Sequence, residues 1–387
     1  MTVLSLRPER CGRGRINFNE TPATSRCPLS RGAAAPSFET VRTTTMTDLV
    51  DIKDLTQQEF EELMVSWGQA PFRARQVQKW LYKGITDVEA MTDVSKALRD
   101  LLREKAILSQ LTLVARQQSQ DGCEKFSFRL DDGEVIESVL IPEEGHHTLC
   151  VSSQVGCAQG CRFCLTARRG FRRQLRPAEI VNQILAVRRL IPAKPALTNL
   201  VFMGMGEPLA NFANLVKALT IILAPWGLNF SSRRVTVSTV GLAPLIPALG
   251  QAVQVNLAVS LNAPTDALRA SLMPIARQYS LEQVLAACRA FPLPPHRRIT
   301  FSYVLLKGVN DQPEHARALA RLLRGQRAKI NLITFNPHPD LPFQAPERET
   351  VLTFQDILIQ AHYTTLIRES RGADISAACG QLAGQVG

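Results

Sequence analysis

The chain lacks several features that would define common protein classes. It has 387 residues and no run of about 18 apolar residues, so the sequence predicts no membrane span. Aromatic residues make up only 6%, which does not favour a stacking platform for single-stranded nucleic acid. Acidic residues are outnumbered, 34 against 45 Lys and Arg, giving a net charge of +11. This charge favours nucleic acid as the partner; a merely soluble basic surface is the alternative.

A disulfide framework is also missing. The nine cysteines are odd in number, the chain is long, and no apolar signal-peptide core is present. Thiols kept reduced for a metal or for catalysis fit this pattern better. We therefore expect a cytoplasmic protein.

Residues 1–45 differ in composition from the rest, with seven Arg, three Glu, no Lys and no Asp. Such a composition is typical of a disordered segment. It is also expected if the start codon is set too far upstream and Met46 is the working start. An organellar targeting peptide is a further alternative, which we favour less.

Residues 46–106 predict a small helical RNA-binding module, and residues 107–146 a β-strand extension. Ser95 is expected to cap the third helix. Glu137 lies in the third extension strand, and the strand pattern alone makes it solvent-facing. The module's expected inward residues are Leu55, Phe60, Leu63, Trp67, Phe72, Val77, Trp80 and Leu81, and its expected basic side carries Arg73, Arg75 and Lys79.

Residues 147–387 alternate strand-like and helix-like segments. This repeating βα pattern predicts an α/β fold with a parallel sheet, a partial (β/α)6-type TIM barrel. In such folds chemistry gathers at the carboxyl ends of the strands. The clearest predicted helices cover 177–190, 211–224, 281–290 and 313–324, and the predicted strands are HTLCVSS, NLVFMGM, RVTVSTVG, VQVNLAVSLN, ITFSYVLLKG, KINLITFN and YTTLIRE.

Three cysteines follow the first of these strands in the stretch GCAQGCRFC. Cys157, Cys161 and Cys164 form a C-x3-C-x2-C motif. Zinc sites usually take four protein ligands in paired knuckles, and no second knuckle is present. Three thiolates around a [4Fe–4S] cluster would leave one iron without a protein ligand, and that iron could bind a substrate.

This spacing at this place resembles the motif of the radical SAM enzymes. The resemblance implies one [4Fe–4S] cluster per chain, whose open iron binds S-adenosylmethionine, and reductive cleavage of that cofactor to a 5′-deoxyadenosyl radical. Phe163, inside the motif, would shield the cluster or serve ordinary packing. GMGEP at 204–208 resembles the family's Gly-Gly-Glu-Pro segment, with Met205 departing from it. The cofactor-binding candidates at the strand ends are Gly206, Glu207, Ser238, Ser260, Leu261, Asn262 and Asn336.

From about residue 50 to 384 the chain further resembles the RlmN-type dual-specificity RNA methyltransferases. Besides the cluster motif, the N-terminal module, GMGEP, SLNAP and the segment RESRGADISAACGQL carry this resemblance. It implies methylation at C2 of one adenine in the peptidyl-transferase centre of 23S rRNA and of one adenine beside the tRNA anticodon. It also implies that Cys379 carries the methyl group, that Cys150 resolves the Cys379–RNA adduct through a disulfide, and that Glu137 accepts the C2 proton.

The implied reaction uses two molecules of S-adenosylmethionine per turnover and an electron donor such as flavodoxin. We expect a monomer that binds no membrane and flips its target base into the barrel. Cys11, Cys27, Cys123 and Cys288 have no predicted role. Phosphate contacts are expected from the basic stretch after the cysteines and from the PPHRR stretch, with Arg168, Arg169, Arg172, Arg173, Arg176, Arg297 and Arg298 as candidates.

Three alternatives remain open at this stage. A Cfr-type enzyme would share the cluster and the cysteine pair but methylate C8; the long N-terminal module and the Glu137 strand favour C2. A non-catalytic iron–sulfur or zinc RNA-binding protein would have four protein ligands and no cofactor cleavage. A radical SAM activase of another protein fits the +11 charge and Cys379 less well.

Overall fold

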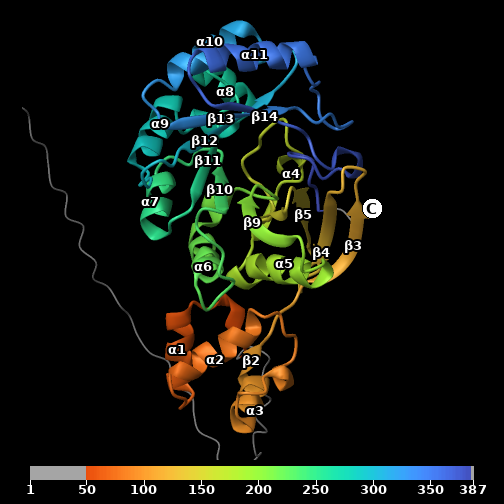
Figure 1. Ribbon diagram of the computed structural model, residues 1–387, viewed down its shortest axis with the longest axis vertical. Helices are drawn as coiled ribbons and strands as arrows, with labels where there is room; N and C mark the ends of the chain where they lie inside the picture. Colours follow the sequence, from red (N-terminus) through yellow and green to blue (C-terminus); the bar gives the residue numbers. More distant parts are fainter. Residues whose placement is uncertain (1–48, 385–387) are drawn as a thin grey trace, which may run out of the picture. The chain divides into compact units, whose positions relative to one another are not determined.

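One ten-stranded sheet organises residues 49–384, the part of the chain that the computed structural model describes (Figure 1). Seven of its strands run parallel in chain order, which confirms the expected α/β fold with a partial barrel. The expectation for residues 1–45, with Cys11 and Cys27, lies outside the described residues. The parallel strands are β6 (His146–Cys150), β9 (Ala196–Phe202), β10 (Val235–Thr239), β11 (Asn256–Ser260), β12 (Ile299–Leu305), β13 (Ala328–Thr334) and β14 (Thr365–Arg368).

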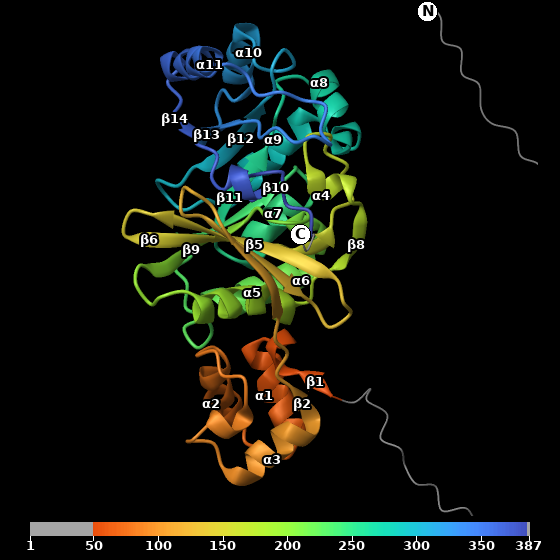
Figure 2. The ribbon, with the colours of Figure 1, turned by 90° about the vertical axis from the view of Figure 1, so that its right-hand side faces the viewer.

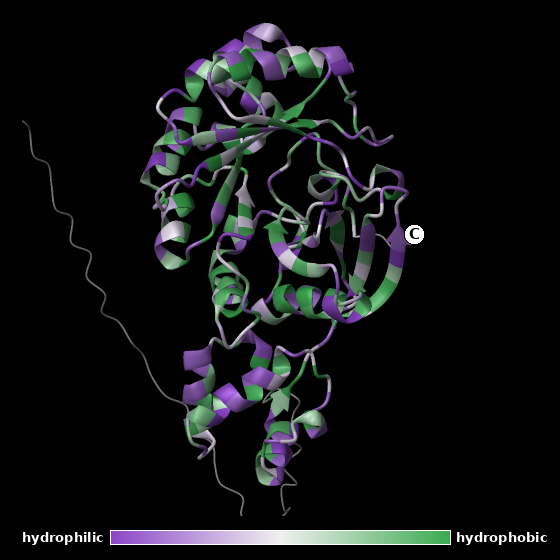
Figure 3. Ribbon diagram, in the orientation of Figure 1, coloured by the Kyte–Doolittle hydropathy of each residue, from purple (hydrophilic) through white to green (hydrophobic). Residues whose placement is uncertain are grey.

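Helices lie in all six connections between consecutive parallel strands, as the βα repeat predicts. The predicted helix 177–190 is confirmed to the residue by α5, whose side chains are mostly buried, and Figure 3 colours this helix largely apolar. The other three predicted helices agree within two residues at each end. The connecting helices are α4 (Leu165–Arg168), α5 (Pro177–Leu190), α6 (Phe212–Leu223), α7 (Leu245–Ala252), α8 (Asp266–Leu272), α9 (Leu281–Ala290), α10 (Pro313–Leu322) and α11 (Arg348–Gln360).

The β-extension continues the barrel sheet beyond β6. Its strands β3 (Thr112–Gln118), β4 (Glu124–Arg129) and β5 (Val135–Glu143) are antiparallel, and β5 pairs with β6 (Figure 2). Glu137 on β5 is buried, with 1% of its surface exposed, so the solvent-facing placement from the strand pattern is wrong. Five consecutive residues of β5 are buried, in place of the alternation expected of a half-exposed strand. Both faces of β5 are therefore covered.

The helical module contains α1 (Gln57–Ser66), α2 (Phe72–Leu81) and α3 (Lys96–Lys105). Ser95 caps α3, as predicted, by accepting a hydrogen bond from the Leu98 backbone N–H at 3.4 Å. Phe60, Val77 and Leu81 are buried as expected, but Phe72 is 56% exposed. Phe72 is the first residue of α2, so its side chain lies at the end of the helix's apolar face rather than within it. Two short strands, β1 (Val50–Asp51) and β2 (Ala106–Ile107), pair in parallel and join the two ends of the module.

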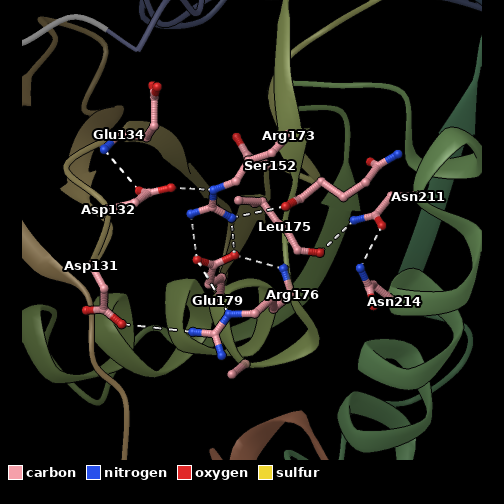
Figure 4. A network of polar contacts seen from close by, with 12 residues as sticks. Asp131, Asp132, Glu134, Ser152, Arg173, Leu175, Arg176, Glu179, Asn211 and Asn214 are labelled. Carbon is pink, nitrogen blue, oxygen red and sulfur yellow. Dashed lines mark hydrogen bonds and ion pairs between the residues drawn. The ribbon is translucent and has the colours of Figure 1, made fainter. Parts of the chain in front are cut away.

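A network of ion pairs connects the helical module, the turn between β4 and β5, and the barrel; Figure 4 shows its part between the turn and the barrel. Arg173 binds Glu179 through both terminal nitrogens, at 2.8 and 2.9 Å, and Asp132 through Nε at 2.5 Å. Arg176 pairs with Asp54 at 2.8 Å and with Asp51 at 3.4 Å. Both arginines are therefore paired with carboxylates, which leaves them less charge for the RNA phosphates that the sequence predicts they contact.

One buried amine of the helical module, that of Lys53, also contacts the barrel. Lys53 is fully buried, and its Nζ donates to the Ser109 carbonyl at 2.7 Å and to Asn182 Oδ1, on α5, at 2.9 Å. Burial lowers the pKa of Lys53 to about 8. Within residues 49–384, no helix combines the length and the apolar character that crossing a bilayer requires.

Candidate active site

The three motif cysteines lie in a loop between two short strands that the sequence did not predict, β7 (Gln154–Gly156) and β8 (Phe171–Gln174). We call residues 157–164 the cluster loop. The Cys157 backbone N–H donates to the Gly170 carbonyl at 3.1 Å, which closes the base of the loop. This close approach requires glycine at 156, because a Cβ there would lie 1.8 Å from the Gly170 oxygen.

The cluster loop fits an iron–sulfur cluster better than a single metal ion. Cys157 and Cys161 are buried and Cys164 is partly buried, and all three are free thiols. Burial raises the pKa of Cys157 to about 12, so a thiolate at this position requires a positive charge beside it. No three His, Cys, Asp or Glu side chains within residues 49–384 converge on one ion position. A cubane cluster does not need such convergence, because each cysteine binds a different iron.

A cavity lies at the carboxyl ends of the parallel strands, where the barrel pattern predicts the chemistry. We call it the strand-end cavity. It has about 900 Å³ of free space, part of it open to solvent. Cys161, Phe163 and Cys164 line it from the cluster loop, and Ser302 on β12, which sequence reasoning missed, also lines it. The predicted cofactor-binding residues that line this cavity are Gly206, Glu207, Ser238, Ser260, Asn262 and Asn336.

Leu261 is the predicted cofactor residue that does not line the strand-end cavity. It is fully buried, and its backbone N–H donates to the Ser302 carbonyl at 3.0 Å. The buried guanidinium of Arg269 donates to the Leu261 carbonyl at 3.3 Å and to the Val240 carbonyl at 2.5 Å. Arg269 thus orders the ends of two strands beneath the cavity. Sequence reasoning missed Arg269, since an arginine in a helix is usually exposed.

The GMGEP segment packs tightly against the strand next to it. At Gly206 (φ +99°) a Cβ would lie 2.5 Å from Gln154, and the Gln154 Oε1 accepts a hydrogen bond from the Glu207 backbone N–H at 2.7 Å. The carboxylate of Glu207 accepts from the backbone N–H groups of Leu209 at 3.1 Å and Val240 at 2.8 Å. Burial raises the pKa of Glu207 to about 7. A cation in the cavity would therefore favour the ionised carboxylate.

Two asparagines at the strand ends already have protein partners. Asn262, at φ +59°, accepts from the Val304 backbone N–H at 2.8 Å through its Oδ1. Asn336 donates from Nδ2 to the Cys379 carbonyl at 3.2 Å. Asn336 thus holds the segment that carries the C-terminal cysteine at the edge of the strand-end cavity.

A second cavity adjoins the first, and Cys379 lines both. Cys150, at the end of β6, lines the second cavity together with Arg368 of β14. Cys379 is exposed towards the cavities, yet the surrounding protein raises the pKa of its thiol, while Arg368 opposes that shift. Burial raises the pKa of Cys150 to about 12. The structure thus brings together the two cysteines that lie 229 positions apart in the sequence.

Glu137 lies on β5 two residues before Val139, which pairs with Cys150 of β6. Its carboxylate borders a separate polar hollow that neither Cys150 nor Cys379 lines. Glu137 Oε2 accepts from the backbone N–H groups of Ala383 at 2.7 Å and Gly384 at 2.9 Å, and Lys125 Nζ lies 3.5 Å from Oε1. Glu137 therefore holds the end of the segment that carries Cys379.

Comparison with known proteins identifies the class to which this fold and loop belong. The sequence model of the radical SAM superfamily matches residues 151–320. A crystal structure of a radical SAM methyltransferase from Sphaerobacter thermophilus superposes with a TM-score of 0.82 at 45% identity, covering 87% of this chain and 100% of that one. The chain is therefore a radical SAM protein, a class that uses S-adenosylmethionine and a [4Fe–4S] cluster.

The particular family follows from three further matches. The model of the ribosomal RNA large subunit methyltransferase N-terminal domain matches residues 50–108. A relative from Geobacter sulfurreducens is 53% identical, covering 88% of this chain and 94% of the relative, and one from Syntrophus aciditrophicus is 51% identical, covering 87% and 97%. Both bear the name dual-specificity RNA methyltransferase RlmN. The chain belongs to the RlmN family.

Proposed function

We propose that this protein transfers a methyl group to C2 of one adenine in 23S rRNA and of one adenine beside the tRNA anticodon. The observation that carries the proposal is the position of Cys379, whose side chain borders both the strand-end cavity and the cavity with Cys150. A thiol at that junction can meet a cofactor on one side and an RNA base on the other. The names of the family's members support RNA as the methyl acceptor.

We assign the cluster to Cys157, Cys161 and Cys164, one cluster per chain. When bound, it supplies the electron that cleaves S-adenosylmethionine reductively. Glu207, Ser238, Ser260 and Asn336 border the space for that cofactor. Cys379 accepts a methyl group from one S-adenosylmethionine, and its S-methyl group gives up a hydrogen atom to the radical formed from a second. Each turnover therefore consumes two molecules of S-adenosylmethionine.

Adenine C2 lies between two ring nitrogens and is electron-poor, so it does not attack a methyl sulfonium. A methylene radical on the Cys379 sulfur can add to it, which tethers the protein to the RNA. We assign Glu137 as the acceptor of the C2 proton. The adduct radical also gives up one electron, which would pass to the oxidised cluster. The Cys150 thiolate then attacks the Cys379 sulfur, and the bond from that sulfur to the methylene carbon breaks with its electron pair on the carbon. The carbon takes up a proton to become the methyl group, and a Cys150–Cys379 disulfide forms as the RNA leaves.

Anaerobic reaction with rRNA and tRNA fragments, followed by nucleoside digestion, tests the proposal. The expected product is 2-methyladenosine from both RNAs, and 8-methyladenosine would contradict it. Cys379→Ala should abolish methylation, and Cys150→Ala should accumulate a protein–RNA adduct. Normal turnover by Cys150→Ala would refute the resolving role.

The two possible roles of Glu137 can be separated by two substitutions. Glu137→Gln keeps an oxygen that can accept from the Ala383 and Gly384 N–H groups but cannot take a proton, whereas Glu137→Ala removes both capacities. If Glu137 is the proton acceptor, Glu137→Gln should methylate Cys379 normally, as seen by mass spectrometry, and release no methylated RNA. Full turnover by Glu137→Gln would limit Glu137 to holding the segment.

We further propose that the protein works in the cytosol as a monomer and takes its electron from a flavodoxin-like donor. The seven described cysteines are all free thiols, which suits a reducing compartment. A spectrum of the reconstituted cluster that changes on addition of S-adenosylmethionine would support the enzyme over a non-catalytic iron–sulfur protein.

A further inference from the structure

Cys161 borders two hollows beside the cluster loop. The first is the strand-end cavity. The second, which we call the outer hollow, is lined by Gly160, Cys161, Arg162, Ala167, Arg168 and Pro342. Cys161 is the one residue that lines both. The cluster loop therefore turns one side towards the space for cofactor and base and another side towards a solvent-accessible hollow.

The rim of the outer hollow is positively charged. Arg162, Arg168 and the neighbouring Arg169 are exposed, and none of them forms an ion pair with a carboxylate of residues 49–384. Arg162 Nη1 has a long contact with the Ser271 carbonyl, at 3.4 Å, and Arg168 donates to the backbone carbonyl of Asp340. These arginines keep their full charge available for an acidic partner.

Packed apolar side chains connect the outer hollow to the strand-end cavity. The guanidinium of Arg162 lies 6.0 Å from the ring centre of Phe343. Phe343 packs edge-on against Phe335, with ring centres 6.0 Å apart, and Phe335 lines the strand-end cavity. Both rings belong to the apolar cluster that includes Cys161. Protein atoms thus fill the path from the surface to the cluster loop. This favours electron transfer, because its rate falls more steeply with distance across an empty gap than through packed protein atoms.

We propose that the outer hollow is the docking surface of an acidic one-electron carrier protein, with Arg162 and Arg168 as its main contacts. The proposal rests on the proposed function, which needs one electron for each reductive cleavage. The carrier is oxidised by one electron, the cluster is reduced by one electron, and no bond or proton moves. RNA suits this surface less well, because the cavity with Cys150 shares no residue with the outer hollow. A carrier could therefore dock without covering the cavity that holds Cys150, although Arg168 also lines the hollow beside Glu137.

Charge reversal at Arg162 tests the docking surface. The Kd for an acidic flavodoxin is measured by fluorescence titration, at low and at physiological salt, for the wild type, Arg162→Glu and the matched control Arg317→Glu. Arg317 is exposed on α10, outside the outer hollow. We expect the Kd to rise at least about tenfold for Arg162→Glu, with a weaker salt dependence, and to stay unchanged for the control.

A chemical reductant separates this inference from the proposed function. For each variant, the rate of S-adenosylmethionine cleavage driven by reduced flavodoxin is divided by the rate driven by dithionite, so that any effect of the substitution on the cluster loop cancels. This ratio should fall about tenfold or more for Arg162→Glu and stay at the wild-type value for Arg317→Glu. Equal flavodoxin affinity and equal flavodoxin-driven cleavage in Arg162→Glu would overturn the docking surface, even if dithionite-driven activity is normal. Weakened RNA binding with unchanged flavodoxin binding would overturn it too. Failure of the wild type with dithionite would refute the proposed function instead.

Discussion

Two glycines beside the cluster loop share one backbone conformation but differ in their surroundings. Gly156 and Gly170 both have φ +73°. A Cβ at Gly156 would lie 1.8 Å from the Gly170 carbonyl oxygen, whereas a Cβ at Gly170 meets no atom within 4 Å. Substituting alanine at each position therefore separates the cost of the backbone conformation from the cost of the collision.

We expect Gly170→Ala to lose about 1 kcal/mol of stability, the cost of a left-handed conformation for a residue with a Cβ. Gly156→Ala should lose more, about 3 kcal/mol, because the loop base must also open. Iron and sulfide content after anaerobic reconstitution should fall for Gly156→Ala and stay near wild type for Gly170→Ala. Equal cluster content in the two variants would contradict this reading.

The buried amine of Lys53 predicts a pH dependence of stability. Its folded pKa is about 8 and its unfolded value 10.5, so between these values the unfolded chain holds a proton that the folded one has lost. Stability gained from this group should therefore rise as the pH increases from 8 to 10.5, by at most roughly 3 kcal/mol. The measurement is the difference in unfolding free energy between the wild type and Lys53→Met across this range. Parallel pH profiles would show that Lys53 is not buried as an amine.

At the scale of elements, the β3–β4 hairpin holds the segment that follows β14. We call residues 369–384 the Cys379 segment. Asp374 of this segment accepts from the Ser119 hydroxyl at 2.6 Å and from the Gln120 backbone N–H at 3.1 Å. Asp121 in the hairpin turn accepts from the Gly372 backbone N–H at 2.8 Å. Glu137 holds the other end of the segment, so Cys379 lies between two fixed points.

Removing one of these attachments should slow methyl transfer to Cys379. Asp374→Ala is expected to lower the rate of Cys379 methylation several-fold, measured by mass spectrometry, while cluster content stays unchanged. Glu124→Ala is the matched control, because Glu124 lies in the same hairpin but pairs with Arg116 rather than with the segment. A wild-type methylation rate for Asp374→Ala would mean that the cavity walls alone position the cysteine.

The elements that sequence could predict are those with strong periodicity. The α5 range is predicted because apolar residues repeat clearly along it, and the predicted strand HTLCVSS overlaps β6, which ends three residues earlier, at Cys150. The β7–β8 pair was missed, since Gln154–Gly156 is too short to show a period and β8 reads as a basic loop. The burial of Glu137 and Arg269 could not be predicted, because their partners are backbone groups on other elements, such as Ala383 for Glu137 and Val240 for Arg269.

For the whole molecule, the basic charge divides into two kinds of arginine. Arg172 is exposed and has no hydrogen-bond or ion-pair partner within residues 49–384, whereas its neighbour Arg173 is bound by Glu179 and Asp132 (Figure 4). The net charge read from the sequence counts both alike. Only the structure separates the arginines available to RNA from those that connect the helical module, the hairpin and the barrel.

This division predicts opposite phenotypes for adjacent residues. Arg172→Gln should weaken RNA binding and lower the slope of log K against log salt by about one, with unchanged thermal stability. Arg173→Gln should lower the midpoint of thermal unfolding, because it leaves the buried Glu179 without its main partner. Filter binding across salt concentrations and thermal melts check the pair. Identical salt slopes for Arg172→Gln and the wild type would remove Arg172 from the RNA surface.

The open edge of the sheet has one more consequence. Between β14 and β3 no strand ladder closes the barrel, and the Cys379 segment bridges the gap through a few side-chain hydrogen bonds. The Cys379 segment can detach from the hairpin without breaking any strand pairing, and the sulfur of Cys379 would move with it. A barrel closed by a full ladder would have to break strand pairing to admit a nucleotide. Here the segment that would open is the one that carries Cys379, the proposed methyl carrier.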